Sequence, residues 1–268
     1  MGTISDNAIC LRHWDFSETS QTVLFFTAEH GLLRGLAKGS KRRNSRFSGG
    51  IDVLTRGQVV AIIKPGKDLA IITEWCLEEV YRSIRVYLHA NRAAMYMADM
   101  VLHMLTDHDP HPDLYCAMRD SLASLGTKDS PQHVLLLFQW RLLGATGYRP
   151  QLDHDTETGA PLPKDAHTLA FSPGAGGVVV DRDSNDRWRV RRSTIELLRT
   201  LDEPSLSPDV PGESIHRASS LLAMYCREIV GRPLPSLSWS FPDLDIRSPR
   251  ETHALSRPSA RQQDRACR

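Results

Sequence analysis

The chain of 268 residues has few cysteines, and none of them stand close together. The five lie far apart, at Cys10, Cys76, Cys116, Cys226 and Cys267, and no CxxC pair occurs. A disulfide scaffold or a cysteine-built zinc site needs closely spaced thiols. The sequence argues against both and predicts scattered, reduced thiols of a cytoplasmic protein.

Long apolar runs and an excess of one charge are also missing. The most apolar stretches, such as residues 134–138, are far shorter than the roughly 20 residues of a membrane helix. Residues 1–10 have neither a basic start nor a hydrophobic segment, so we expect no secretory signal and no membrane partner. With 33 Lys and Arg against 32 Asp and Glu, a nucleic-acid surface would have to be a local patch.

The common catalytic motifs are absent, since no GxSxG, HExxH or P-loop occurs. The glycine-rich run 174–177 lacks the Lys-Ser/Thr ending of a phosphate-binding loop. Acidic residues and histidines gather in a spacing that matches no standard zinc site, at Asp153, His154, Asp155, His167, Asp181 and Asp183. A metal-dependent hydrolase that uses Asp153, His154 and Asp155 stays open as an alternative.

The first eighty residues read as short strands, predicted over 8–12, 22–27, 32–37, 58–63 and 68–73. A Pro-Gly turn at residues 64–67 joins the last two. Strands at this spacing favour a small barrel.

From residue 81 the apolar residues recur at three- and four-residue steps, which predicts helices over 91–105, 113–125, 134–143, 193–201 and 214–230. The all-round apolar helix at 134–143 should lie at the centre of its core. We therefore expect a barrel at 1–80 and a helical domain at 81–237, with a loop-rich insert at about 148–190. From residue 238 Pro, Ser and Arg replace aliphatic residues, so 238–268 should be a disordered tail.

A local basic segment runs from residue 34 to 56. It holds seven cations against one acid, Asp52, and the cations are Arg34, Lys38, Lys41, Arg42, Arg43, Arg46 and Arg56. Cations along a loop gain affinity for nucleic acid by releasing counterions, and its glycines and serines would let the backbone follow a phosphate chain. Phe47 is a candidate for stacking on a base. The alternative is a solvated basic loop without a partner.

Several runs resemble the opening of the bacterial DNA repair protein RecO family. They are Cys10-Leu11-Arg12, Glu18-Thr19, Phe26-Thr27 followed by Gly31, Ala37-Lys38-Gly39 and Ser45-Arg46-Phe47. The match continues with Asp68-Leu69, with Leu-Leu-x-x-x-Gly-Tyr-x-Pro-x-Leu at 142–152 and with Phe171-Ser172-Pro173. The resemblance covers about residues 8–232.

The resemblance implies an α+β multidomain protein, with an N-terminal OB-fold barrel, an all-α helical domain and a zinc-finger-like but cysteine-less insert. It implies a recombination mediator, not an enzyme, that works without a cofactor in the cytoplasm, associated with the nucleoid. Family members bind single- and double-stranded DNA, anneal complementary strands and help to load recombinase onto coated strands. Their partners are RecR, sometimes RecF, and the C-terminal tail of single-stranded-DNA-binding protein.

By matching position, the implied DNA contacts are Arg34, Lys38, Lys41, Arg42 and Arg46, to which we add Arg43 and Phe47. Many members hold zinc with two CxxC pairs, whose positions here are Asp155, Thr158, Val180 and Asp183. Valine cannot ligate a metal, so we expect no zinc. The competing function is a non-catalytic scaffold whose barrel binds an acidic partner peptide.

Overall fold

The computed structural model describes residues 2–47, 49–126, 130–180, 187–202, 210–232 and 234–244. A five-stranded barrel comes first, formed by β1 (Gly2–Asp15), β2 (Gln21–Thr27), β3 (Gly31–Ala37), β4 (Arg56–Ile63) and β5 (Ala70–Glu79). It closes in the order β1-β2-β3-β5-β4, with β3 and β5 parallel and the other neighbours antiparallel. This is the arrangement of an OB fold, and the predicted fold class is confirmed.

Strand β1 is much longer than the short strand predicted at 8–12. Its first half pairs with β4, from Gly2 opposite Ile63 to Ile9 opposite Arg56. Its second half pairs with β2, with a bulge between Cys10 and Arg12. The ends of β1 are largely exposed and polar, so the apolar pattern showed only its middle. One strand thereby joins both neighbours and closes the barrel.

The middle of strand β2 is a continuous apolar run because both of its faces are buried there. Val23 and Phe25 belong to the core inside the barrel. Leu24 and Phe26 point the other way and belong to a second, larger core shared with the helices. Alternate residues of the same strand therefore stabilise two different packing layers.

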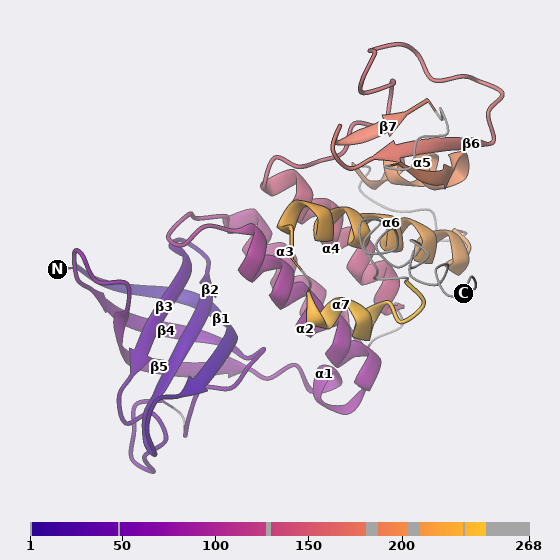
Figure 1. Cartoon of the computed structure of the whole chain (residues 1–268). Coiled ribbons are helices and arrows are strands. Elements are labelled where there is room, and N and C mark those ends of the chain that lie inside the picture. The colour runs from indigo at the N-terminus through magenta and orange to yellow at the C-terminus, as the bar shows by residue number, and fades with distance from the viewer. Residues whose placement is uncertain are drawn as a thin grey trace, which may run out of the picture.

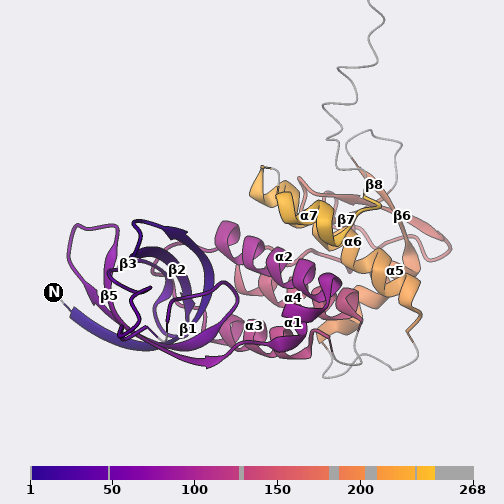
Figure 2. The same cartoon turned by 90° about the horizontal axis from the view of Figure 1, so that it is seen from below.

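The helical domain is built from α2 (Leu88–Met104), α3 (Pro112–Ser124), α4 (Pro131–Ala145) and α6 (Gly212–Val230), with the shorter α1 (Arg82–Val86) and α7 (Pro235–Ser240). As predicted, α4 is central, and it contacts α2, α3 and α6. The barrel and the helices lie end to end in both views (Figures 1 and 2). Within the described ranges, no helix has the length and apolar character needed to cross a membrane.

The insert contains a small sheet in addition to its loops. Its antiparallel strands β6 (Thr168–Ser172), β7 (Gly177–Val179) and β8 (Trp188–Arg191) stand in the order β7-β6-β8, and α5 (Arg192–Arg199) follows. Phe171 stacks on Trp188 at 5.9 Å and meets Tyr225 of α6 edge-on at 5.2 Å. The insert therefore packs onto the helical core.

The barrel is joined to the helices by an ion pair to a buried carboxylate and by a close backbone contact. Arg12 of β1 pairs with Asp99 of α2, whose other carboxylate oxygen accepts a hydrogen bond from the Ser236 hydroxyl of α7. Gly31 has a φ of +66°, and a Cβ there would lie 2.2 Å from the carbonyl oxygen of Asp109. Only glycine fits this approach, so the barrel is held tightly against the helices.

The predicted tail begins too early at residue 238. Helix α7 continues to Ser240, and the Phe241 side chain is fully buried and meets Tyr96 edge-on at 5.6 Å. The composition shift hid these few apolar residues, which supply the last part of the helical core. Residues 245–268 lie outside the described residues.

Replacing Phe241 with Ala should lower the free energy of unfolding by about 3–5 kcal/mol, because it removes a fully buried ring. Trp239→Ala is the matched control, since Trp239 lies on α7, two residues before Phe241, and is 48% exposed. It should cost less than about 1 kcal/mol. Urea unfolding of both variants checks the prediction, and equal losses would contradict the packing of Phe241.

Candidate nucleic-acid interface

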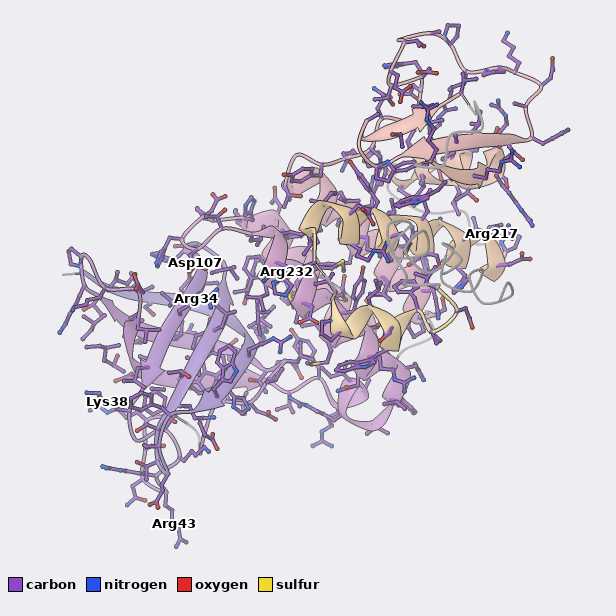
Figure 3. All side chains as sticks on the ribbon, in the orientation of Figure 1. Arg34, Lys38, Arg43, Asp107, Arg217 and Arg232 are labelled. Carbon is purple, nitrogen blue, oxygen red and sulfur yellow. The ribbon has the colours of Figure 1, made fainter. Side chains whose placement is uncertain are left out.

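The basic segment leaves β3 and folds over the end of the barrel that lies away from the helices. Gly39, with a φ of +69°, lets the chain turn directly after the strand. The Lys41 N–H then donates to the Thr19 carbonyl in the turn between β1 and β2 at 3.1 Å. Figure 3 shows Arg43 at the far tip of this end and Lys38 beside it.

A buried polar cluster anchors this loop. The fully buried Ser40 hydroxyl donates to the Gln21 side-chain oxygen at 2.9 Å, and the Gln21 amide nitrogen donates to the Ile51 carbonyl at 3.0 Å. The Ser45 hydroxyl donates to the Ser40 carbonyl at 2.9 Å. The serines were predicted to leave the backbone free, but they hold it in place.

Phe47 is only 5% exposed and packs in the barrel core with Ile51 and Trp75. The loop crosses the open end of the barrel, and its apolar side chains close that end against water. The ring is therefore not available to a base, which corrects the prediction that Phe47 stacks.

Four of the seven cations meet acids from outside the segment. Arg34 pairs with Asp107 at 2.9 Å, Arg46 with Glu74 at 2.6 Å, Arg56 with Glu78 at 2.5 Å, and Lys41 with Asp15. The local charge count therefore overstates the positive surface. Partly exposed pairs of this kind contribute about 1 kcal/mol or less, so a phosphate can replace the carboxylate at small cost.

The other three cations, Lys38, Arg42 and Arg43, are exposed, and no carboxylate of the described residues lies within ion-pairing distance of them. We call these three the free cations. The Arg42 side chain lies across Gly39, with its Cδ 3.3 Å from where a Cβ would stand. They form a compact positive surface on an anchored loop.

Two exposed aromatic residues, Trp14 and Phe16, lie at the end of β1 beside this loop, 50% and 64% exposed. They were not among the predicted site residues. The sequence signal that could have identified them is a pair of aromatic residues directly before the polar residues Ser17–Ser20.

Comparison with known proteins accounts for both parts of the fold. The family model for the N-terminal domain of recombination protein O matches residues 1–81, and the model for its C-terminal domain matches residues 86–238. The chain belongs to the RecO family. The predicted resemblance is confirmed.

Similar proteins include three that are each named DNA repair protein RecO. The chain is 31% identical to the protein of Rhodopirellula baltica over 211 residues, which cover 78% of this chain and 77% of that protein. It is 28% identical to the Cutibacterium acnes protein over 88% of this chain and 98% of that one. For the Myxococcus xanthus protein the identity is 26%, over 89% and 97%. These matches support a role in DNA repair and recombination.

At one of the four positions where the resemblance would place zinc ligands, this chain has a buried carboxylate. Asp155 is 1% exposed, and one of its oxygens accepts the N–H groups of Glu157 and Thr158, each at 2.9 Å. The other oxygen accepts the Val180 N–H at 2.9 Å. Three N–H groups surround an anion and repel a cation, so these residues do not fit zinc. Asp155 itself joins the two segments that the zinc would connect.

The alternative metal site is not formed by the described residues. Asp153 points to Arg199, at 3.3 Å, while Asp155 binds backbone N–H groups. Nowhere in the described ranges do three or more His, Cys, Asp or Glu gather in a way that could hold a metal ion. Asp181 and Asp183 lie outside the described residues.

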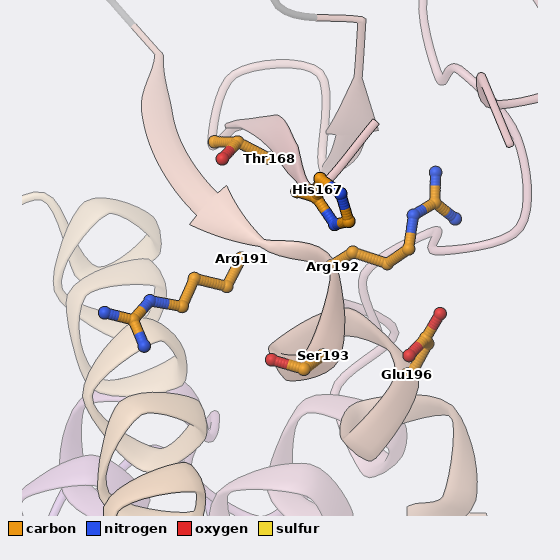
Figure 4. Close-up of a pocket in the computed structure, with 6 residues that line it drawn as sticks. All are labelled: His167, Thr168, Arg191, Arg192, Ser193 and Glu196. Atoms are coloured by element: carbon orange, nitrogen blue, oxygen red, sulfur yellow. The ribbon is translucent and has the colours of Figure 1, made fainter. Parts of the chain in front are cut away.

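A pocket at the start of α5 is a weaker candidate for a ligand site. Figure 4 shows its lining residues, His167, Thr168, Arg191, Arg192, Ser193 and Glu196. The Arg192 guanidinium donates to the carbonyls of Ala166 (2.7 Å) and Pro163, and Glu196 adds a negative charge. The Arg192 guanidinium is thus already bound to backbone carbonyls and lies in the same pocket as a carboxylate, so we assign the pocket no ligand.

Burial alone would raise the pKa of the Asp155 carboxyl, but its hydrogen bonds to Val180, Thr158 and Glu157 lower it below the ordinary value of 3.8. Asp155→Asn should therefore cost about 1–3 kcal/mol at pH 7, because the amide turns an N–H group toward at least one backbone donor. A group with a lowered pKa stabilises the fold above its ordinary pKa and loses this effect as the pH falls. The difference from wild type should shrink below pH 4, as thermal unfolding can measure.

Asp153→Asn is the control for Asp155→Asn. Its carboxylate is 78% exposed and makes one ion pair, so the change should cost less than about 1 kcal/mol. If both variants lose the same stability, or if the difference from wild type grows in acid, Asp155 does not hold the insert together.

Proposed function

We propose that this RecO-family protein binds single- and double-stranded DNA at the end of the barrel that carries the free cations Lys38, Arg42 and Arg43. The observation that carries the proposal is that these three side chains are exposed, with no acidic partner among the described residues, on a loop anchored by Ser40 and Gln21. An anchored loop holds its charges together without a large ordering cost on binding.

The same surface supports annealing of complementary strands. Two DNA backbones repel each other, and cations that neutralise phosphates of both strands lower this repulsion. Arg34, Lys41 and Arg46 add contacts when phosphate replaces their carboxylate partners. No bond is made or broken in annealing, so we propose a mediator that catalyses no covalent reaction.

We further propose that the protein helps to load recombinase onto strands coated by single-stranded-DNA-binding protein. Its partners would be RecR, in some members of the family RecF, and the acidic C-terminal tail of the coat protein. Membership of the family supports these partners. We assign no residue of the helical domain to them.

Replacing the free cations Lys38, Arg42 and Arg43 together by Ala should weaken binding to both DNA forms without unfolding the protein, since the three side chains are exposed. Each phosphate contact on a single strand contributes a slope of about −0.7 to log K against log salt. The slope of the triple variant should therefore be shallower by about 2, and annealing should slow. Fluorescence anisotropy with a labelled oligonucleotide at several salt concentrations measures the slope.

A triple variant of Arg92, Arg141 and Lys164 is the matched control. These exposed residues of the helical domain and insert make no ion pair with any described residue, and the same charge is removed. Its salt slope should equal that of wild type. A free-cation variant with wild-type affinity and slope would place the DNA surface elsewhere. If the protein binds an acidic peptide and does not bind DNA, the alternative function of a non-catalytic interaction scaffold is favoured.

A further inference from the structure

The two exposed aromatic residues beside the basic loop lie outside both hydrophobic cores of the described residues. Trp14 is 50% and Phe16 64% exposed, and neither belongs to the barrel core or to the core shared with the helices. Large apolar side chains exposed next to each other on a folded domain mark binding surfaces more often than chance.

Strand pairing places Trp14 on the outer face of the barrel. Trp14 is opposite Thr22, Thr22 is opposite Leu36, and Leu36 is opposite Ile71. Side chains of paired residues share a face, so these four form one row across β1, β2, β3 and β5. Leu36 and Ile71 are partly exposed and, like Trp14, belong to neither core. The row is a largely apolar, partly exposed strip.

The helices cover the other half of this face. A corresponding row lies farther along β1, β2 and β3 and consists of Ile9, Phe26 and Leu32. All three of its side chains are buried in the core shared with the helices. Between the two rows, Arg12 and Arg34 are held by Asp99 and Asp107 of the helical domain. The helical domain thus ends at the arginines and leaves the strip uncovered.

The loop that carries the free cations contacts the chain around the two aromatic residues through Lys41. Asp15, between the two aromatic residues, pairs with Lys41, and the Lys41 N–H donates to Thr19 at 3.1 Å. Lys38 follows directly after β3, two residues beyond Leu36. A strand whose phosphates lie on the free cations would therefore place its bases beside Trp14 and Phe16.

We propose that Trp14 and Phe16 stack on unpaired bases of single-stranded DNA whose backbone is held by the free cations. This inference rests on the proposed function and names the form of DNA that the site selects. Every base has an apolar face, so stacking favours single strands without regard to their sequence. In a duplex these faces are covered by neighbouring base pairs, and only the cations contribute.

Stacking is compatible with annealing. It occupies the face of a base and leaves the Watson–Crick edge free to pair. A complementary strand can therefore read a base while it rests on Trp14 or Phe16, and pairing then releases the base from the ring.

The test uses the full chain and three labelled probes of equal length: a single strand, the same strand without bases, and a duplex with hairpin-closed ends. Trp14→Ala, Phe16→Ala and the double variant should each bind the normal single strand more weakly, by about tenfold for each ring lost. Affinities for the baseless strand and the duplex should be unchanged. The salt slope should also be unchanged, because no phosphate contact is removed.

Two exposed aromatic residues elsewhere provide matched controls. Trp239 and Tyr148 are each 48% exposed and lie on α7 and after α4, so their Ala variants should bind all three probes like wild type. Trp14→Phe and Phe16→Tyr keep a ring and should keep most of the affinity. These conservative variants also test binding if an Ala variant unfolds.

The outcomes separate this inference from the function on which it rests. If wild-type protein binds neither DNA form, the proposed function fails, and the inference fails with it. If wild type binds DNA but the double variant still prefers the normal strand over the baseless strand, stacking at this site is wrong. An equal loss on all three probes would likewise assign Trp14 and Phe16 to the fold and not to the bases.

Discussion

The ion pair between the partly exposed Arg12 of the barrel and the buried Asp99 of the helical domain sets how the rest of the molecule is arranged. Asp99 is almost fully buried, and a buried carboxylate without a partner would strongly destabilise the fold, so Arg12 and Ser236 must both reach it. The contact fixes how far the helices extend over the outer face of β1, β2 and β3. One half of that face becomes core, and the other half stays available to a ligand.

The positive surface is a consequence of folding as much as of composition. Ion pairs with distant acids neutralise part of the basic segment, while Ser40 and Gln21 anchor the loop and present the free cations to solvent. Anchoring reduces the entropy that a long basic loop would lose on binding. The end of the barrel thus combines preorganised charge with Phe16 and with the strip that contains Trp14.

The insert is held together by hydrogen bonds to a buried carboxylate. A zinc ion joins two chain segments through thiolates, whereas Asp155 joins two segments through backbone N–H groups. The carboxylate is buried, and both of its oxygens accept backbone N–H groups. Phe171 and Trp188 add the apolar contact that fastens the insert to α6.

The sequence by itself determined the local features, because these depend on neighbours along the chain. The strands 22–27 and 32–37 and the central helix α4 could all be read from it. Only the tertiary structure decided which cations stay free, because the acids that pair with Arg34 and Arg46 are 73 and 28 residues away. It also buried Phe47 beneath its own loop and exposed Trp14, since burial depends on what covers a side chain in space and not on its residue type.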